Sequence, residues 1–166
     1  MEMNYNMLFL TALVPMIIGF VWYGPLFGKA WMVEMGFTKE SLAKANMFKI
    51  LFFSYLFSLM ISFFLATVVI HQTGIFSTLA GEPGFADKTG AAFGYYQDFI
   101  STYGDRFRTF SHGALHGAIA SIFFILPVVS IIALFERKSF KYVALNVGYW
   151  MVTLAIMGGI VCKWNY

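Results

Sequence analysis

Residues 47–70 read MFKILFFSYLFSLMISFFLATVVI, and this stretch decides the class of protein. A helix needs roughly 20 apolar residues to cross a hydrocarbon core about 30 Å thick, and this run is long enough to do so. Its one charged residue, Lys49, lies near one end, where a long side chain can reach the lipid headgroups. The stretch therefore predicts a transmembrane helix.

Three further apolar stretches of similar length occupy much of the remaining chain. They lie at about residues 5–23, 110–135 and 142–162. Pro15 and Pro127 fall inside two of them and predict kinks. Inside a bilayer the backbone must satisfy its own hydrogen bonds, and none of the stretches alternates as a barrel strand does. We therefore expect an all-α integral membrane protein, with residues 1–166 forming a single transmembrane domain that is a four-helix bundle.

The composition favours the same conclusion. Of the residues, 60% are hydrophobic and only 11% are charged, and the mean hydropathy is +0.73. A soluble domain carries about a quarter charged residues to cover its surface, so the outer surface of this chain must face lipid. The net charge of +3 comes from basic residues near the span ends, where membrane topology and anionic lipids explain them better than nucleic acid does. We expect membrane lipids and no nucleic acid as partners.

The distribution of lysine and arginine predicts the orientation in the membrane. The two short loops share one side and carry seven basic residues: Lys29, Lys39, Lys44, Lys49, Arg137, Lys138 and Lys141. The other side carries four: Lys88, Arg106, Arg108 and Lys163. Because cytoplasmic loops are enriched in Lys and Arg, the short loops are predicted to be cytoplasmic. Both termini are then outside, and the expected location is the cytoplasmic (inner) membrane.

Capping residues predict where two of the helices begin. Thr38 is expected to cap a helix that starts near Lys39 in water and enters the membrane near Met47. Ser139 is expected to cap the fourth span in the same way.

The loop at about residues 71–109 is the largest segment outside the predicted spans. Glycines and Pro83 interrupt it, but Phe93, Tyr96, Ile100 and Tyr103 recur at helical spacing. One interpretation is a short amphipathic helix that lies at the outer membrane interface. The other is a loop packed on itself, and the spacing does not separate the two.

Small residues recur on one face of three spans and predict close helix packing. They are Ser54, Ser58, Ser62 and Ala66 in the second span, Gly113, Gly117 and Ser121 in the third, and Ala144, Gly148, Ala155 and Gly159 in the fourth. A substrate path between helices would use the same residues, although packing is their ordinary role. Because three stripes exceed the need of one compact bundle, we expect a homo-oligomer or a subunit of a larger membrane complex.

Four residues that can bind metals are predicted at the outer ends of the spans. His71 ends the second span, His112 and His116 open the third one helical turn apart, and Cys162 closes the fourth. Histidine with cysteine suits zinc or copper, and His71 with a histidine of the third span would suit a haem. The competing interpretation is that the histidines hydrogen-bond the middle loop and fix its position. A single His-x-x-x-His pair is a weak signal, so the sequence favours this second interpretation.

Motifs of soluble enzymes are missing from the sequence, including phosphate loops, dinucleotide fingerprints and nucleophile elbows. No Asp or Glu lies inside a predicted span, which argues against a proton-coupled carrier. We therefore predict a non-enzymatic structural or accessory subunit, or a component that binds lipid or a partner. The alternatives are a metal- or haem-binding protein that uses the outer histidines, and a small oligomeric transporter or channel.

The stretch GFVWYGPLFGKAW at residues 19–31 is the most distinctive local signature. Together with GALHG at 113–117, FERKS at 135–139 and NVGYW at 146–150, it resembles the bacterial membrane-protein family "domain of unknown function 1761". The resemblance leaves out the middle loop. It implies a small four-span membrane bundle without an assigned activity, and it carries over no catalytic residue.

Overall fold

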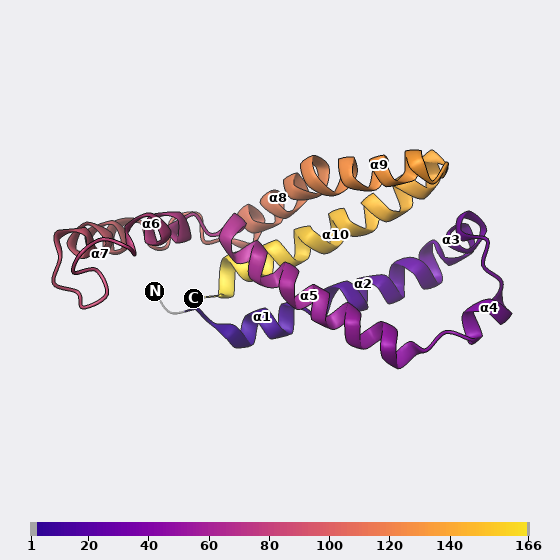
Figure 1. Cartoon of the computed structure of the whole chain (residues 1–166), viewed down its shortest axis with the longest axis horizontal. Coiled ribbons are helices and arrows are strands. Elements are labelled where there is room, and N and C mark those ends of the chain that lie inside the picture. The colour runs from indigo at the N-terminus through magenta and orange to yellow at the C-terminus, as the bar shows by residue number, and fades with distance from the viewer. Residues whose placement is uncertain (1–2, 166) are drawn as a thin grey trace.

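The computed structural model describes residues 3–165, and every regular element in that part of the chain is helical (Figure 1). Four helices are long and apolar enough to cross a membrane: Tyr5–Leu26, Met47–Val69, Phe110–Phe135 and Phe140–Trp164. The all-α architecture and the four predicted spans are confirmed.

Two of the long helices are irregular near their prolines. The first consists of α1 (Tyr5–Thr11), α2 (Val14–Val21) and the π-helical turn η1 (Trp22–Leu26). The third consists of α8 (Phe110–Ala120), the π-helical turn η2 (Ser121–Ile125) and α9 (Leu126–Phe135). Pro15 lies in the first turn of α2, after a two-residue break at Ala12 and Leu13. Pro127 is the second residue of α9 and directly follows η2, and the helix continues through residues 110–135 without a gap. The kink predicted at Pro15 is therefore a break, whereas before Pro127 the helix only changes to a π-helical turn.

The other two long helices are continuous, namely α5 (Met47–Val69) and α10 (Phe140–Trp164). The hydroxyl of Ser139 accepts a hydrogen bond from the amide of Tyr142, which confirms the predicted cap of α10. Thr38 caps the separate short helix α4 (Lys39–Ala43), and Asn46 caps α5. The expectation of one helix continuing from Lys39 into the membrane was wrong, because the backbone between α4 and α5 leaves the helical path.

The helix α10 lies at the centre of the bundle, between α8–α9 on one side and α1–α2 with α5 on the other (Figure 1). Its buried side chains Leu154, Met157 and Val161 pack with Leu8 of α1 and Leu65 of α5. The amide of Asn4 donates to the carbonyl of Asn165 at 2.7 Å, so the two ends of the described chain meet. We call this end of the bundle the terminal end, and the opposite end, which carries α3 (Gly28–Met35) and α4, the connector end.

Glycines let α8 and α10 touch backbone to backbone. A Cβ atom on Gly113 would overlap the carbonyl of Gly158, and one on Gly117 would overlap the carbonyl of Leu154. The stripe predicted for the third span thus makes a close helix contact. On α10, however, Gly158 makes this contact, whereas Gly159 faces the ring of Phe110.

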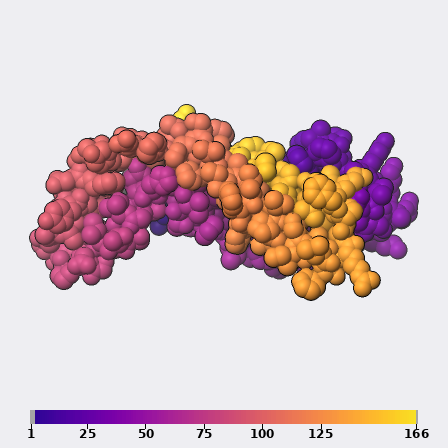
Figure 2. Space-filling view, turned by 90° about the horizontal axis from the view of Figure 1, so that it is seen from above, coloured from indigo at the N-terminus to yellow at the C-terminus, as the bar shows by residue number. Residues whose placement is uncertain are grey.

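The middle loop forms a helical hairpin of α6 (Gln72–Leu79) and α7 (Ala91–Tyr103), which extends beyond the terminal end (Figure 2). The rings of Phe76, Phe85, Phe93 and Tyr96 pack together inside it, with centroid distances between 5.5 and 6.3 Å. The loop thus contains the helix that the first interpretation expected, and the rings of Phe93 and Tyr96 on it pack within the loop, as the second expected. A position of α7 at the membrane interface stays a prediction.

Candidate functional site

Three histidines meet at the terminal end of the bundle, where α5, α6 and α8 come together. His71 lies between α5 and α6, immediately before the first residue of α6, and His112 and His116 occupy the first two turns of α8. The side chain of Thr109 accepts a hydrogen bond from the amide of His112 and so fixes the start of α8. His71 is exposed, and the other two are half-buried.

The three imidazole rings are close enough to share one ion. One ring nitrogen of each lies within 4.8 Å of one ring nitrogen of the others, and the Nε2 atoms of His71 and His112 are 2.9 Å apart. The ring centroids are 4.5 to 5.0 Å apart. Helical spacing brings His112 and His116 together, whereas the packing of α5 against α8 adds His71.

Phe107 supports the cluster from the loop that precedes α8. Its ring stacks on His112 with a centroid distance of 5.1 Å, and it meets His71 edge-on at 6.3 Å. The backbone of Phe107 is left-handed, with φ of 64°, which costs a bulky residue on the order of 1–3 kcal/mol. This strain persists where surrounding contacts determine the conformation, and here those contacts include the histidines.

Cys162 does not belong to the group of converging ring nitrogens that the described residues form. Its buried thiol lies 3.4 Å from the carbonyl oxygens of both Val69 and Phe107. These contacts hold together the two chain segments that flank the histidines. As a metal ligand, Cys162 would have to give up both of them.

A pocket of about 320 Å³ adjoins the cluster and shares His71 with it. Its other lining residues are Gln72, Phe99, Tyr103, Arg106 and Phe107. The buried amide of Gln72 donates to the carbonyls of Tyr103 and Arg106, at 2.9 and 3.0 Å, and so fixes one wall of the pocket. The sequence gives no sign of this pocket, because its lining comes from two segments, 71–72 and 99–107, that are far apart in the chain.

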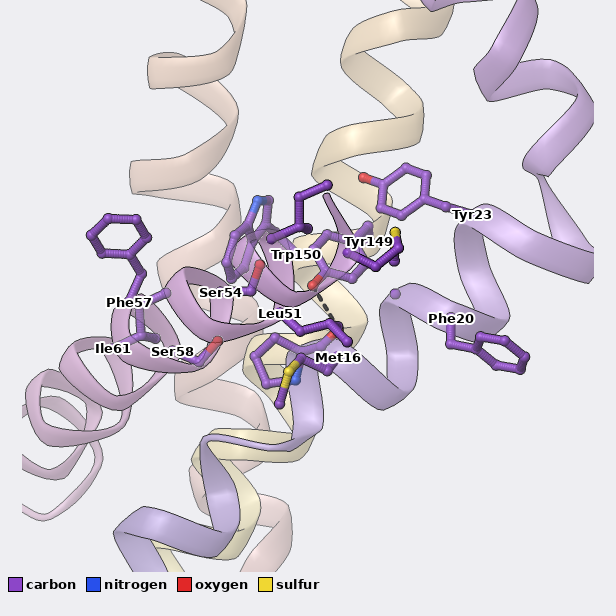
Figure 3. Close-up of a pocket in the computed structure, with 14 residues that line it drawn as sticks. Met16, Phe20, Tyr23, Leu51, Ser54, Phe57, Ser58, Ile61, Tyr149 and Trp150 are labelled. Carbon is purple, nitrogen blue, oxygen red and sulfur yellow. Dashed lines mark hydrogen bonds between the residues drawn. The ribbon is translucent and has the colours of Figure 1, made fainter. Parts of the chain in front are cut away.

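A second cavity, here called the lateral groove, lies between α2, α5 and α10 and has a volume of about 470 Å³ (Figure 3). Its walls are mainly apolar and aromatic, and include Met16, Leu51, Phe57 and Trp150. The hydroxyl of Tyr149 donates to the carbonyl of Pro15 at 2.8 Å, which ties α10 to α2 in the wall of the groove. Ser54 and Ser58, predicted as packing residues of α5, line this space.

The comparisons with known proteins place the chain in a family but give it no activity. A family model described as "Protein of unknown function (DUF1761)" matches residues 6–162. Neither the curated proteins nor the solved structures contain a match.

Proposed function

This chain belongs to the DUF1761 family of proteins of unknown function, and from that premise we propose that it binds a divalent first-row transition-metal ion through His71, His112 and His116. The family model gives no activity, so the proposal depends on the geometry of the chain itself. Zinc and copper are the metals that imidazole nitrogens favour most strongly.

A single observation carries the proposal: a histidine 41 residues away in the sequence meets a histidine pair on α8. Two histidines one helical turn apart are common on helix surfaces, but a third ring nitrogen within 4.8 Å of both makes a three-ligand set. Zinc binds imidazole nitrogen at about 2.0–2.1 Å, which small side-chain rotations would reach from this arrangement. The rings touch one another, so the space suits one ion better than a porphyrin.

The position of the cluster supports a role at the membrane surface. His71 is exposed, so an ion can enter from water at the terminal end. On the basis of the lysine and arginine distribution, we place this end outside the cytoplasmic membrane. The ligand set that the described residues supply is three imidazoles. We propose binding of the ion as the function.

Metal titration of the purified protein tests the proposal. The protein would carry an affinity tag without histidine and would be stripped of metal before calorimetric titration with Zn²⁺ and Cu²⁺. We expect one ion per chain, and binding at least about 100-fold weaker for His71→Ala, His112→Ala and His116→Ala. Asp98→Ala, an exposed change on the hairpin helix α7, is the matched control and should bind as the unmodified chain does. Less than half an ion per unmodified chain would contradict the proposal.

The lateral groove favours a second candidate function, the binding of a phospholipid acyl chain. The groove lies between three helices that are long and apolar enough to cross the membrane, so its occupant must come from the bilayer. Native mass spectrometry of the protein released from nanodiscs should detect a retained phospholipid. Ser54→Phe would fill the groove and should abolish retention, whereas Met60→Phe, on an exposed face of the same helix, should not. Equal retention by the two variants would contradict this role.

A further inference from the structure

The pocket beside His71 combines an uncompensated positive charge with aromatic walls. The guanidinium carbon of Arg106 lies 5.8 Å from the ring centroid of Tyr103 and 5.3 Å from that of Phe107. Within residues 3–165 the ion pair that forms joins Lys141 to Glu34 at the connector end, so no carboxylate neutralises Arg106. An anion in this pocket would be the electrostatic partner that the described part of the chain does not give to Arg106.

The histidine cluster supplies the second positive charge. Three protein ligands leave the fourth position of a tetrahedral metal ion open to water or to another ligand. Because His71 belongs both to the cluster and to the pocket wall, an ion on His71 lies next to the pocket. The pocket then has a metal ion on one side and a guanidinium on another, with the rings of Phe99, Tyr103 and Phe107 as apolar surface.

We propose that this pocket binds a small carboxylate with an apolar or aromatic body, and this inference rests on the proposed metal site. One carboxylate oxygen occupies the open position of the metal ion, and the other accepts hydrogen bonds from Arg106. The body of the ligand packs against Phe99 and Tyr103. The volume of about 320 Å³ lies at the lower end of the range for small-molecule pockets, about 300–1,000 Å³, and so favours a ligand of few atoms.

Hydrogen bonds from the side chain of Gln72 support a preformed pocket. The side chain of Gln72 is buried, and its amide holds the carbonyls of Tyr103 and Arg106 where α7 ends. Phe107 contacts His71 and His112 and also lines the pocket. Because these contacts already fix the pocket, the chain loses less conformational entropy on binding, which favours affinity for a small ligand.

Calorimetric titration with benzoate tests the inference. The zinc-loaded full-length protein in a neutral detergent should bind benzoate at one site, and at least tenfold more weakly after zinc is removed. Acetate carries the same carboxylate without the ring, and benzamide carries the ring without the charge, so each should bind at least tenfold more weakly than benzoate. Arg106→Gln should lower the affinity for benzoate at least tenfold while the protein still binds one zinc ion.

Lys163→Gln is the matched control, because Lys163 is also a cation over an aromatic ring at the terminal end, 4.7 Å from the ring centroid of Trp164. It should leave benzoate binding unchanged. If Arg106→Gln fails to bind zinc, Phe99→Ala replaces it as the variant expected to weaken benzoate binding. Normal zinc binding with equal benzoate affinity in the zinc-loaded, metal-free and variant proteins would overturn this inference and leave the metal site intact. Failure of the unmodified protein to bind zinc would overturn both.

Discussion

At the scale of single residues, glycines decide how closely the third and fourth spans approach. Gly113 and Gly158 face each other, and their backbones occupy the space that side chains fill elsewhere. A Cβ atom on either glycine would overlap the carbonyl of the other. In a bilayer the close contact of helix backbones replaces the hydrophobic effect as the main source of helix association. The histidine cluster depends on this contact, since it holds the start of α8 in place.

We predict that Gly113→Ala destabilises the protein by about 1–3 kcal/mol, because the added methyl group must separate α8 from α10. Thermal unfolding in detergent, followed by circular dichroism, measures the change. Gly94→Ala is the matched control: a Cβ atom there meets nothing within 4 Å, so the helix α7 should gain about 0.5–1 kcal/mol. Equal stability of the two variants would show that the contact between the helices contributes little.

At the scale of elements, α10 is the axis on which the other helices pack. Its first turn is fixed at the connector end by Ser139, whose hydroxyl caps the helix and also donates to the carboxylate of Glu34 in α3. Lys141 adds an ion pair to the same carboxylate at 3.7 Å. One acidic side chain thus links the first loop to the start of the central helix.

We predict that Ser139→Ala destabilises the protein by roughly 1 kcal/mol, because the amide of Tyr142 loses its acceptor. Chemical unfolding in mixed micelles gives the free energy of unfolding. Ser101→Ala is the control, since the hydroxyl of Ser101 donates to a carbonyl within α7 and caps no helix. Ser139→Asn should keep most of the stability, because asparagine also caps helices well. A loss as large for Asn as for Ala would argue against capping as the cause.

At the scale of the whole molecule, the described chain is a bundle with a hairpin of α6 and α7 projecting from its terminal end (Figure 1). The contact between Asn4 and Asn165 places the two ends of the described chain on one side, as an even number of spans requires. Of the small residues in the three predicted stripes, several are buried within the single chain, among them Ser58, Ser62, Gly113, Gly117 and Gly159. The fold therefore uses internally much of the surface from which the sequence analysis predicted assembly.

We predict that single cysteines in place of Lys44 and Lys138 react only with membrane-permeant reagents in intact cells. A cysteine in place of Asp98, on the hairpin, should react with impermeant maleimides as well. The reason is the excess of lysine and arginine in the two short connections. Native Cys162 is fully buried and gives little background. Labelling of the Lys44 and Lys138 positions from outside, with the Asp98 position protected, would invert the topology.

We also predict a homo-oligomer or a stable complex with another membrane protein, since small-residue stripes recur on three spans. Native mass spectrometry from lipid nanodiscs should show a dimer or larger assembly. As a control for random co-insertion, the protein is reconstituted with a large excess of nanodiscs. Two copies then rarely enter one disc by chance. A single monomeric species under both conditions would count against assembly.

The class of fold follows from the amino-acid sequence alone, because the length and hydropathy of each segment decide whether it can cross the bilayer. The sequence also places His112 and His116 on one helical face, since residues four apart are neighbours on any helix. The packing of the helices brings His71 to this pair, leaves the thiol of Cys162 hydrogen-bonded to two carbonyls instead, and makes Gly158 the residue that contacts α8. These outcomes depend on the rotation and crossing of helices far apart in the sequence, and a helical repeat fixes which residues share a face but not which face meets which neighbour.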